Sequence, residues 1–315
     1  MKKLNKIHEI ILGIVCFSFF IIITTSCEEN DGKNLTKKYG KKIGVLLVNH
    51  GSHSETWRKA LLDLEDSVRI TIFKNKDIEG IKTAFMEYNE PSIATRLKEF
   101  DSENFTDVII VPIFLTVSSH SFDDIPTIIG AKNDKHSMEL LKIEKIERYT
   151  PKAKIHITPL LNFTNILQRN IVKRVESLTQ NSQMEGLVLI AYGDKTYNKE
   201  WSALLEKVGN SVKEKIGIDK FSIGWCGHVA HYNPDSTTIV ISKVLEEKEK
   251  AIVIPVLVAH DEMFQIKIIG DGISKVPNAK RKVIYKPDAI LPDKNIQNWI
   301  IEVTNEFANK ISNNI

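Results

Sequence analysis

Short apolar runs alternate with amphipathic helical patterns along most of the chain. Residues 43–48 are apolar and include one glycine, which is typical of a parallel strand buried on both faces. Further apolar runs predict strands at residues 81–86, 108–114, 155–158, 187–191, 221–225, 252–258 and 283–286. Apolar positions at helical spacing predict intervening helices at residues 57–68, 91–100, 123–129, 163–175, 201–212, 237–245 and 296–307.

The second half of this pattern repeats the first. The helical stripe Trp57, Ala60, Leu61, Leu64 and Val68 recurs 144 residues later as Trp201, Leu204, Leu205, Val208 and Val212. Pro112 and Pro255 likewise occupy matching places in apolar runs, 143 residues apart. We therefore expect an α/β fold of two duplicated, doubly wound parallel-sheet domains. The polar stretch QNSQME separates them, so the predicted domains are residues 42–180 and 185–315.

The N-terminus has the features of an export signal. Lysines in residues 1–9 precede an apolar run at 10–23, which is shorter than the ~20 residues that span a bilayer. Small residues then lead to Cys27, and this order resembles a bacterial lipoprotein signal. It predicts a signal peptide at residues 1–26, a polar tether at 27–41 and an exported lipoprotein attached at Cys27, on the periplasmic face or in the outer membrane. An uncleaved signal anchor is the alternative.

Composition and charge narrow the class of protein. The chain has 315 residues, with 43 Lys and Arg against 40 Asp and Glu, a net charge of +3 that does not favour a nucleic-acid partner. Three cysteines are too few for a disulfide scaffold. Cleavage would remove Cys16, lipid would occupy Cys27, and Cys226 would remain as a thiol. We expect Cys226, which ends a strand, to be a small buried apolar group.

Chemically active side chains follow three successive predicted strands of the first domain. His50 follows the first strand, Glu87 the second and His120 the third. Because ligands bind at the carboxyl ends of parallel strands, these side chains are expected to converge at one edge of the sheet. Imidazole and carboxylate suit divalent Fe, Co, Ni or Zn, and they also accept protons. Taken singly, each residue could equally be a capping or surface residue.

Three stretches around these residues resemble one enzyme family. They are GVLLVNHGS at 44–52, AFMEYNEPSIATRL at 84–97 and VIIVPIFLTVSSHSFDDIP at 108–126. Together they are similar to the sirohydrochlorin chelatases, the class II tetrapyrrole metallochelatases. The resemblance implies two doubly wound halves with the tetrapyrrole in the cleft between them, and a divalent metal (Co²⁺, Fe²⁺ or Ni²⁺) as substrate without an organic cofactor. It implies that His50 and His120 are metal ligands or bases, and that Glu87 is a ligand or proton acceptor.

The sequence departs from the family pattern at several points. Ser118 and Ser119 stand where the family usually has glycine, and Tyr192-Gly193-Asp194 replaces His-Gly-Ser in the second half. Met263 roughly matches His120, so the second half is expected to form the opposite wall of the cleft. Its histidines are expected to line the cleft, with a second metal site as the alternative; they are His228, His231 and His260. Asp124 is expected to cap the helix that begins at Ile125.

The resemblance favours a metallochelatase that inserts Co²⁺ or Fe²⁺ into a tetrapyrrole such as sirohydrochlorin. The export signal keeps two alternatives open. One is a lipid-anchored protein that binds metal or tetrapyrrole for uptake or storage, and the other is an enzyme that removes metal from a scavenged tetrapyrrole. A binding protein for an unrelated solute would share the two-domain α/β fold, but it would not need the His-Glu-His set.

Overall fold

A computed structural model describes residues 40–161 and 164–313. The predicted signal peptide, Cys27 and nearly all of the predicted tether lie outside the described residues. The described residues from Lys41 onward form one compact unit. Within the described ranges, no helix combines the length and the apolar character needed to cross a bilayer.

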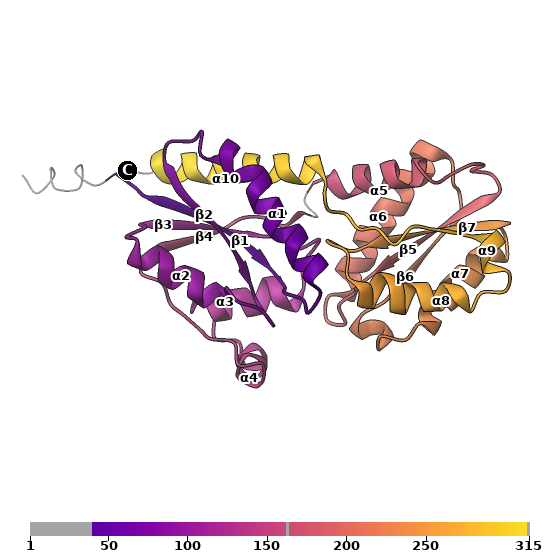
Figure 1. Ribbon diagram of the computed structural model, residues 1–315, viewed down its shortest axis with the longest axis horizontal. Helices are drawn as coiled ribbons and strands as arrows, with labels where there is room; N and C mark the ends of the chain where they lie inside the picture. Colours follow the sequence, from indigo (N-terminus) through magenta and orange to yellow (C-terminus); the bar gives the residue numbers. More distant parts are fainter. Residues whose placement is uncertain (1–39, 162–163, 314–315) are drawn as a thin grey trace, which may run out of the picture. The chain divides into compact units, whose positions relative to one another are not determined.

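Two four-stranded parallel sheets form the framework (Figure 1). Their strand orders are β2-β1-β3-β4 and β6-β5-β7-β8, so the second sheet repeats the first. The strands are β1 (Ile43–Asn49), β2 (Ile78–Phe85), β3 (Asp107–Pro112), β4 (Lys154–Ile157), β5 (Glu185–Ala191), β6 (Phe221–Trp225), β7 (Lys250–Val256) and β8 (Val283–Tyr285). This arrangement confirms the predicted fold class, and along the chain the polar stretch at 180–185 leads into the second sheet, with Glu185 as the first residue of β5.

Helices connect the strands. They are α1 (Glu55–Ile72), α2 (Ile93–Ser102), α3 (Ile125–Ile128), α4 (Lys135–Ile143), α5 (Ile166–Glu176), α6 (Asn198–Ile216), α7 (Asp235–Leu245), α8 (Asp271–Ser274), α9 (Ala279–Lys282) and α10 (Lys294–Asn313). The sequence pattern did not predict α4. It also placed Pro91 in the first turn of a helix, which is wrong. The Ser92 side chain accepts a hydrogen bond from the backbone N–H of Thr95 and caps α2, so the helix begins after Pro91.

Alternate side chains of the central strands enter different hydrophobic clusters. In β1, Val45 and Leu47 face one cluster, whereas Leu46 and Val48 face another. In β5, Leu187 and Leu189 belong to the same cluster as Val45 and Leu47, while their neighbours face a third. Each sheet is therefore covered on both faces, and one apolar cluster runs through both halves.

Two helices cross from one half of the chain to the other (Figure 1). Helix α10, the last of the chain, packs on α1 and β3 in the first half, and its Asn305 accepts a hydrogen bond from Asn75 at 3.1 Å. Helix α5 packs on α6 and β7 in the second half, where Arg174 donates to the carbonyl of Pro255 at 2.8 Å. Each sheet thus obtains a covering helix from the other half of the sequence.

Candidate metal centre

The ends of β1 and β2 bring His50 and Glu87 together. These strands are neighbours, with Asn49 opposite Phe85, so the residues that follow each strand emerge side by side. The backbone N–H of Glu87 donates to the carbonyl of His50 at 2.8 Å. Gly51 makes this approach possible, because its φ is +109° and a methyl group there would lie 2.0 Å from the Glu87 carbonyl oxygen.

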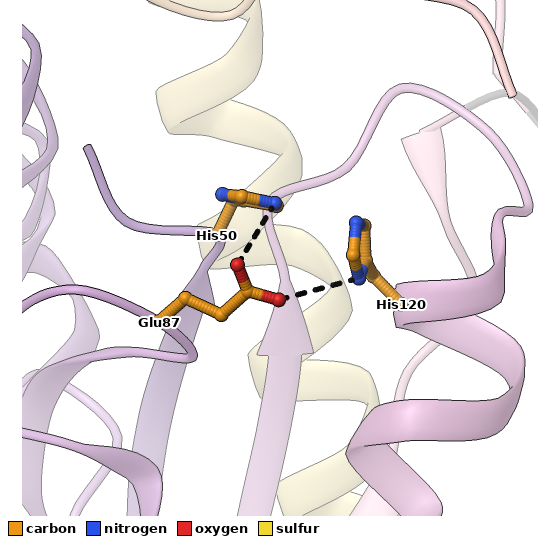
Figure 2. Close-up of side chains that lie close together, drawn as sticks. All are labelled: His50, Glu87 and His120. Carbon is orange, nitrogen blue, oxygen red and sulfur yellow. Dashed lines mark ion pairs between the residues drawn. The ribbon is translucent and has the colours of Figure 1, made fainter. Parts of the chain in front are cut away.

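His120 reaches the same place from the other side of β1. It begins a short π-helical turn, His120–Asp124, in the loop that follows β3. Such turns are rare and occur frequently at functional sites. Figure 2 shows the three side chains pointing toward one another, with the carboxylate of Glu87 between the two imidazole rings.

The spacing of the three side chains suits a metal ion. Glu87 Oε2 lies 3.8 Å from His50 Nε2, and Glu87 Oε1 approaches the His120 ring at 3.9 Å from Nδ1, the nitrogen that Asp124 holds. One ligand atom from each residue can be chosen so that all lie within 4.8 Å of one another. Ligand atoms at ~2.0–2.2 Å from a metal are separated by about 3–4 Å, so only a small contraction is needed. Within the part of the chain that the structure describes, this is the one group of such residues found that close together.

Hydrogen bonds to the rings leave one nitrogen of each histidine available for a metal. His50 Nδ1 lies 3.0 Å from the carbonyl oxygen of Gly51, and His120 Nδ1 lies 2.9 Å from Asp124 Oδ2. Since both partners are acceptors, each Nδ1 carries the proton in the neutral ring. The lone pair is then on Nε2, the arrangement typical of histidines that bind metals.

The two histidines have opposite electrostatic environments. Burial lowers the pKa of His50, and the positive charge of a protonated His120 lowers it further, against the opposing charge of Glu87. Burial alone would also lower the pKa of His120. The hydrogen bond to Asp124 and the charge of Glu87 outweigh it, so the pKa of His120 is raised. The surroundings of His50 therefore favour its neutral, metal-binding form, whereas those of His120 favour the protonated form more than water does.

Asp124 orients His120 instead of capping a helix, so the sequence-based expectation for this residue is wrong. Its side chain makes no capping hydrogen bond to α3. Helix α3 continues directly from the π-helical turn, and the N–H of Ile125 already donates to the carbonyl of His120. Asp124 is consequently free to hold the imidazole, as carboxylates commonly do beside metal-binding histidines. The i, i+4 spacing of the two residues was the sequence signal for this contact.

A cavity of about 570 Å³ adjoins His50 and His120, which is within the usual range of small-molecule sites. Both halves of the chain line it. From the second half come Tyr192, Gly193, Asp194, Lys195, Thr196, Trp201, His228, Tyr232, Val256, Leu257, Val258, Ala259, Asp261, Met263 and Phe264. Of the three histidines expected to line a cleft, His228 lies in this wall, whereas His231 and His260 are not among the lining residues.

Equivalent backbone hydrogen bonds show which residues of the second half occupy the positions of His50 and Glu87. The N–H of Glu87 donates to the carbonyl of His50, and the N–H of Gly227 donates in the same way to the carbonyl of Tyr192. Tyr192 therefore stands in the place of His50, and Gly227 in the place of Glu87. Met263 begins a second π-helical segment, Met263–Gly270, as His120 begins the first. The second half thus has the same backbone without the metal-ligating side chains.

Reciprocal hydrogen bonds join the two halves around the cavity. Ser52, after β1, donates to Asp261 Oδ2 at 2.5 Å, and Ser54 donates to Glu262 at 2.7 Å. In the opposite sense, Asp194, after β5, accepts from the backbone N–H of Ser119 at 3.1 Å. The loop after the first strand of each half therefore binds the loop after the third strand of the other half.

A family model and the related sequences both indicate similarity to sirohydrochlorin chelatases. The CbiX family model matches residues 44–178. The sirohydrochlorin cobaltochelatase of Saccharolobus solfataricus is 26% identical over 133 residues, which are 42% of this chain and 93% of that protein. The sirohydrochlorin cobaltochelatase of Methanococcoides burtonii is 34% identical over 89 residues, 28% of this chain and 65% of that protein.

Solved structures show the same fold. SirB from Bacillus subtilis with Fe³⁺ aligns with a TM-score of 0.61 at 17% identity, covering 85% of this chain and 96% of SirB. The sirohydrochlorin chelatase SirB from Bacillus subtilis subspecies spizizenii, in complex with cobalt, aligns with a TM-score of 0.58 at 15% identity and the same coverage. At such low identity these matches establish the fold, and the chemistry has to be argued from the side chains.

Proposed function

Because residues 44–178 belong to the CbiX family of sirohydrochlorin chelatases, we propose that this protein is a metallochelatase that inserts a divalent metal into a tetrapyrrole such as sirohydrochlorin. The observation that carries the proposal is the convergence of His50, Glu87 and His120 beside a cavity of about 570 Å³. A site for this reaction has to hold a metal ion and a macrocycle in contact.

The donor set suits a metal that must be passed on. Two imidazoles and one carboxylate leave coordination positions open, which macrocycle nitrogens can enter while the protein ligands leave. Insertion forms bonds from the metal to the ring nitrogens and releases both pyrrole protons, so the reaction needs a proton acceptor. Glu87, which lies between the two imidazoles, is the proposed acceptor of one of these protons, and an imidazole that the metal leaves on insertion takes the other.

We propose Co²⁺ or Fe²⁺ as the metal substrate. Imidazole and carboxylate accept several first-row divalent metals, Ni²⁺ included, so the donor atoms alone do not select one. The relatives support cobalt and iron, because the related sequences are named cobaltochelatases and the SirB structures hold cobalt or Fe³⁺.

Glu87→Gln tests the mechanism, because it preserves the shape of the side chain and removes its basicity. Metal-insertion turnover, followed by visible absorption with sirohydrochlorin and Co²⁺, should fall by roughly 10²–10⁴, the usual effect of losing a positioned base. Glu90→Gln is the matched control. Glu90 Oε2 accepts a hydrogen bond from the backbone N–H of Ser92 at 2.6 Å, so its role is local and turnover should stay near wild type.

One result would count against the mechanism, and another against the enzymatic function itself. Undiminished turnover in Glu87→Gln would remove the carboxylate from the mechanism. Stoichiometric uptake of metal or tetrapyrrole by the wild-type protein, without turnover in either direction, would favour the binding protein over the enzyme.

We also propose that the protein is a lipoprotein attached to a membrane through Cys27, on the periplasmic face or in the outer membrane. The basic start, the apolar run of residues 10–23 and the small residues before Cys27 support this. Cys27→Ser should leave an uncleaved precursor or release the protein into the soluble fraction, as judged by immunoblotting of fractionated cells. A cleaved variant that stays in the membrane fraction would refute lipid attachment.

A further inference from the structure

The wall that the second half contributes to the cavity contains an imidazole, that of His228. The backbone equivalence of the two halves pairs Tyr192 with His50, and it therefore pairs the next residue along, His228, with Tyr88. In the first half the rings of His50 and Tyr88 lie 5.9 Å apart between centroids, and in the second half those of Tyr192 and His228 lie 5.4 Å apart. The histidine and the tyrosine have thus exchanged places between the two halves.

The ring of His228 is held in the same way as the ring of His120. The hydroxyl of Tyr232 lies 2.9 Å from His228 Nδ1, and it belongs to a residue four positions on, as Asp124 is four positions on from His120. The same hydroxyl lies farther from Nε2, at 3.3 Å, so Nδ1 is its partner. It also lies 3.0 Å from the hydroxyl of Tyr192, so it can accept from Nδ1–H and donate to Tyr192. Nε2 then keeps its lone pair, which is the arrangement typical of metal-binding histidines.

The surroundings of His228 favour a neutral ring that faces the metal centre. Burial lowers the pKa of His228, and the positive charge of a protonated His120 lowers it further, against the charges of Glu87 and Asp194. The charge of His228 in turn lowers the pKa of His50. The side chain of His228 is nevertheless exposed to the cavity, so a ligand in the cavity can reach its ring. His228 therefore lies across the cavity from the metal centre, within the range of its charges.

We infer that His228 is the axial ligand of the metal once the metal lies in the macrocycle, on the ring face opposite His50 and His120. This inference rests on the proposed metallochelatase function and adds a protein ligand to its product complex. The macrocycle nitrogens surround the metal in the plane of the ring and leave the axial positions open to donors such as imidazole. The lone pair of Nε2 forms the new metal–nitrogen bond, and no proton or electron is transferred because the ring is already neutral. A donor on this face stabilises the metal in the macrocycle after the first-half imidazoles have released it.

The test uses cobalt(II) sirohydrochlorin that is prepared without the enzyme, so that binding is measured independently of turnover. In the absence of oxygen, low-spin Co²⁺ in such a ring has an unpaired electron, and an axial imidazole nitrogen splits its electron paramagnetic resonance lines into triplets. We expect these triplets when the cobalt ring is bound to the full-length protein. Trp57 and Trp201 line the cavity, so quenching of tryptophan fluorescence measures the affinity for the cobalt ring and for metal-free sirohydrochlorin.

His228→Phe keeps an aromatic ring beside Tyr192 and removes both nitrogens. It should abolish the triplets and weaken binding of the cobalt ring by about tenfold or more, because a coordinate bond is lost, and change the affinity for metal-free sirohydrochlorin by less than about twofold. His260→Phe is the matched control, because His260 also belongs to the second half but is not a lining residue, and its Nδ1 lies 2.8 Å from the carbonyl oxygen of Pro287. It should change neither the triplets nor the two affinities.

Tyr232→Phe tests the arrangement independently, without altering the imidazole. It removes the hydroxyl beside Nδ1 and keeps the aromatic ring, which lies 6.3 Å from that of Phe264. The triplets should persist, whereas the affinity for the cobalt ring should fall by ~10-fold or more, the usual effect of losing such a partner. The affinity for metal-free sirohydrochlorin should stay near wild type. Equal losses of affinity for both rings would show that Tyr232 shapes the wall and does not prepare a metal ligand.

The outcomes separate this inference from the proposed function. A bound cobalt ring without triplets in the wild type, or with triplets that survive in His228→Phe, would overturn the axial ligand and leave the metallochelatase in place. Triplets that disappear in His50→Ala or His120→Ala but persist in His228→Phe would show that the metal keeps a first-half imidazole, and they would overturn the inference as well. If the wild type bound neither Co²⁺ nor sirohydrochlorin, the proposed function would fail and the inference with it.

Discussion

Replacement of Asp124 by asparagine should weaken metal binding while leaving the ligands themselves in place. The Asp124 carboxylate holds the Nδ1–H of His120 at 2.9 Å, and its side chain is only 6% exposed. The amide N–H of asparagine can instead donate a hydrogen bond to Nδ1, which favours the tautomer whose ring proton is on Nε2, the atom needed for the metal. Loss of such a partner typically reduces metal affinity by ~10–100-fold, or about 1.4–2.7 kcal/mol.

The same replacement should change the pH dependence of binding in a defined direction. The pKa of His120 is raised above its ordinary value, against burial, by the hydrogen bond to Asp124 and the charge of Glu87. A metal binds the neutral ring, so affinity in the wild type falls as the pH drops through this raised pKa. Without the Asp124 charge, burial dominates and the pKa of His120 falls. The variant should therefore bind more weakly at neutral pH, with its acid-induced loss beginning at a lower pH.

Calorimetric or absorption titration with Co²⁺ between about pH 5 and 8 measures both effects. Asp123→Asn is the control, since Asp123 accepts a hydrogen bond from Tyr197 at 3.2 Å and pairs with Lys132. It should keep wild-type affinity and pH dependence. If Asp124→Asn bound Co²⁺ with unchanged affinity and an unchanged pH midpoint, the carboxylate would have no part in preparing His120.

Two further perturbations test the local structure. Gly51→Ala forces a methyl group against the Glu87 carbonyl at a φ of +109°, so we expect the free energy of unfolding to fall by more than about 2 kcal/mol and Co²⁺ binding to be lost. Gly217→Ala is the control, because Gly217 has a φ of +82° but a methyl group there would have no atom closer than 3.6 Å. It should lower the free energy of unfolding by about 1 kcal/mol and leave Co²⁺ binding unchanged. Cys226 is fully buried and burial raises the pKa of its thiol, so it should resist iodoacetamide in the native protein and react after unfolding, as peptide mass mapping would show; rapid native labelling would contradict its burial.

The sequence was sufficient to predict the fold and the convergence of three side chains. Buried parallel strands produce continuous apolar runs, and adjacent strands deliver the residues that follow them to one edge. His50, Glu87 and His120 therefore meet because β1 lies between β2 and β3. The roles of these residues as ligands or bases stay predictions.

The sequence was not sufficient for features that depend on unusual backbone or on partner choice. A helical pattern starting near Asp123 led to the prediction that Asp124 caps the helix. In the structure Asp124 ends a π-helical turn instead, and its side chain contacts His120. Helix α4 was not predicted, although its His136 and Leu140 line the cavity. An apolar stripe on a helix also does not say which sheet it covers, so the crossing of α5 and α10 could not be read from periodicity.

That crossing makes the two halves of the chain dependent on each other. A polypeptide ending near residue 180 would lack α10, the helix that packs on its sheet. It would also contain α5, but not the second sheet on which the apolar face of α5 packs. Such a half could complete itself only by exchanging helices with a second copy, and its assembly would then vary with concentration. Joining both halves in one polypeptide makes the exchange intramolecular, so it persists at any dilution. Because each half then has its own stretch of sequence, the two halves need not be identical. One can keep the metal ligands while the side chains of the other change to suit the macrocycle.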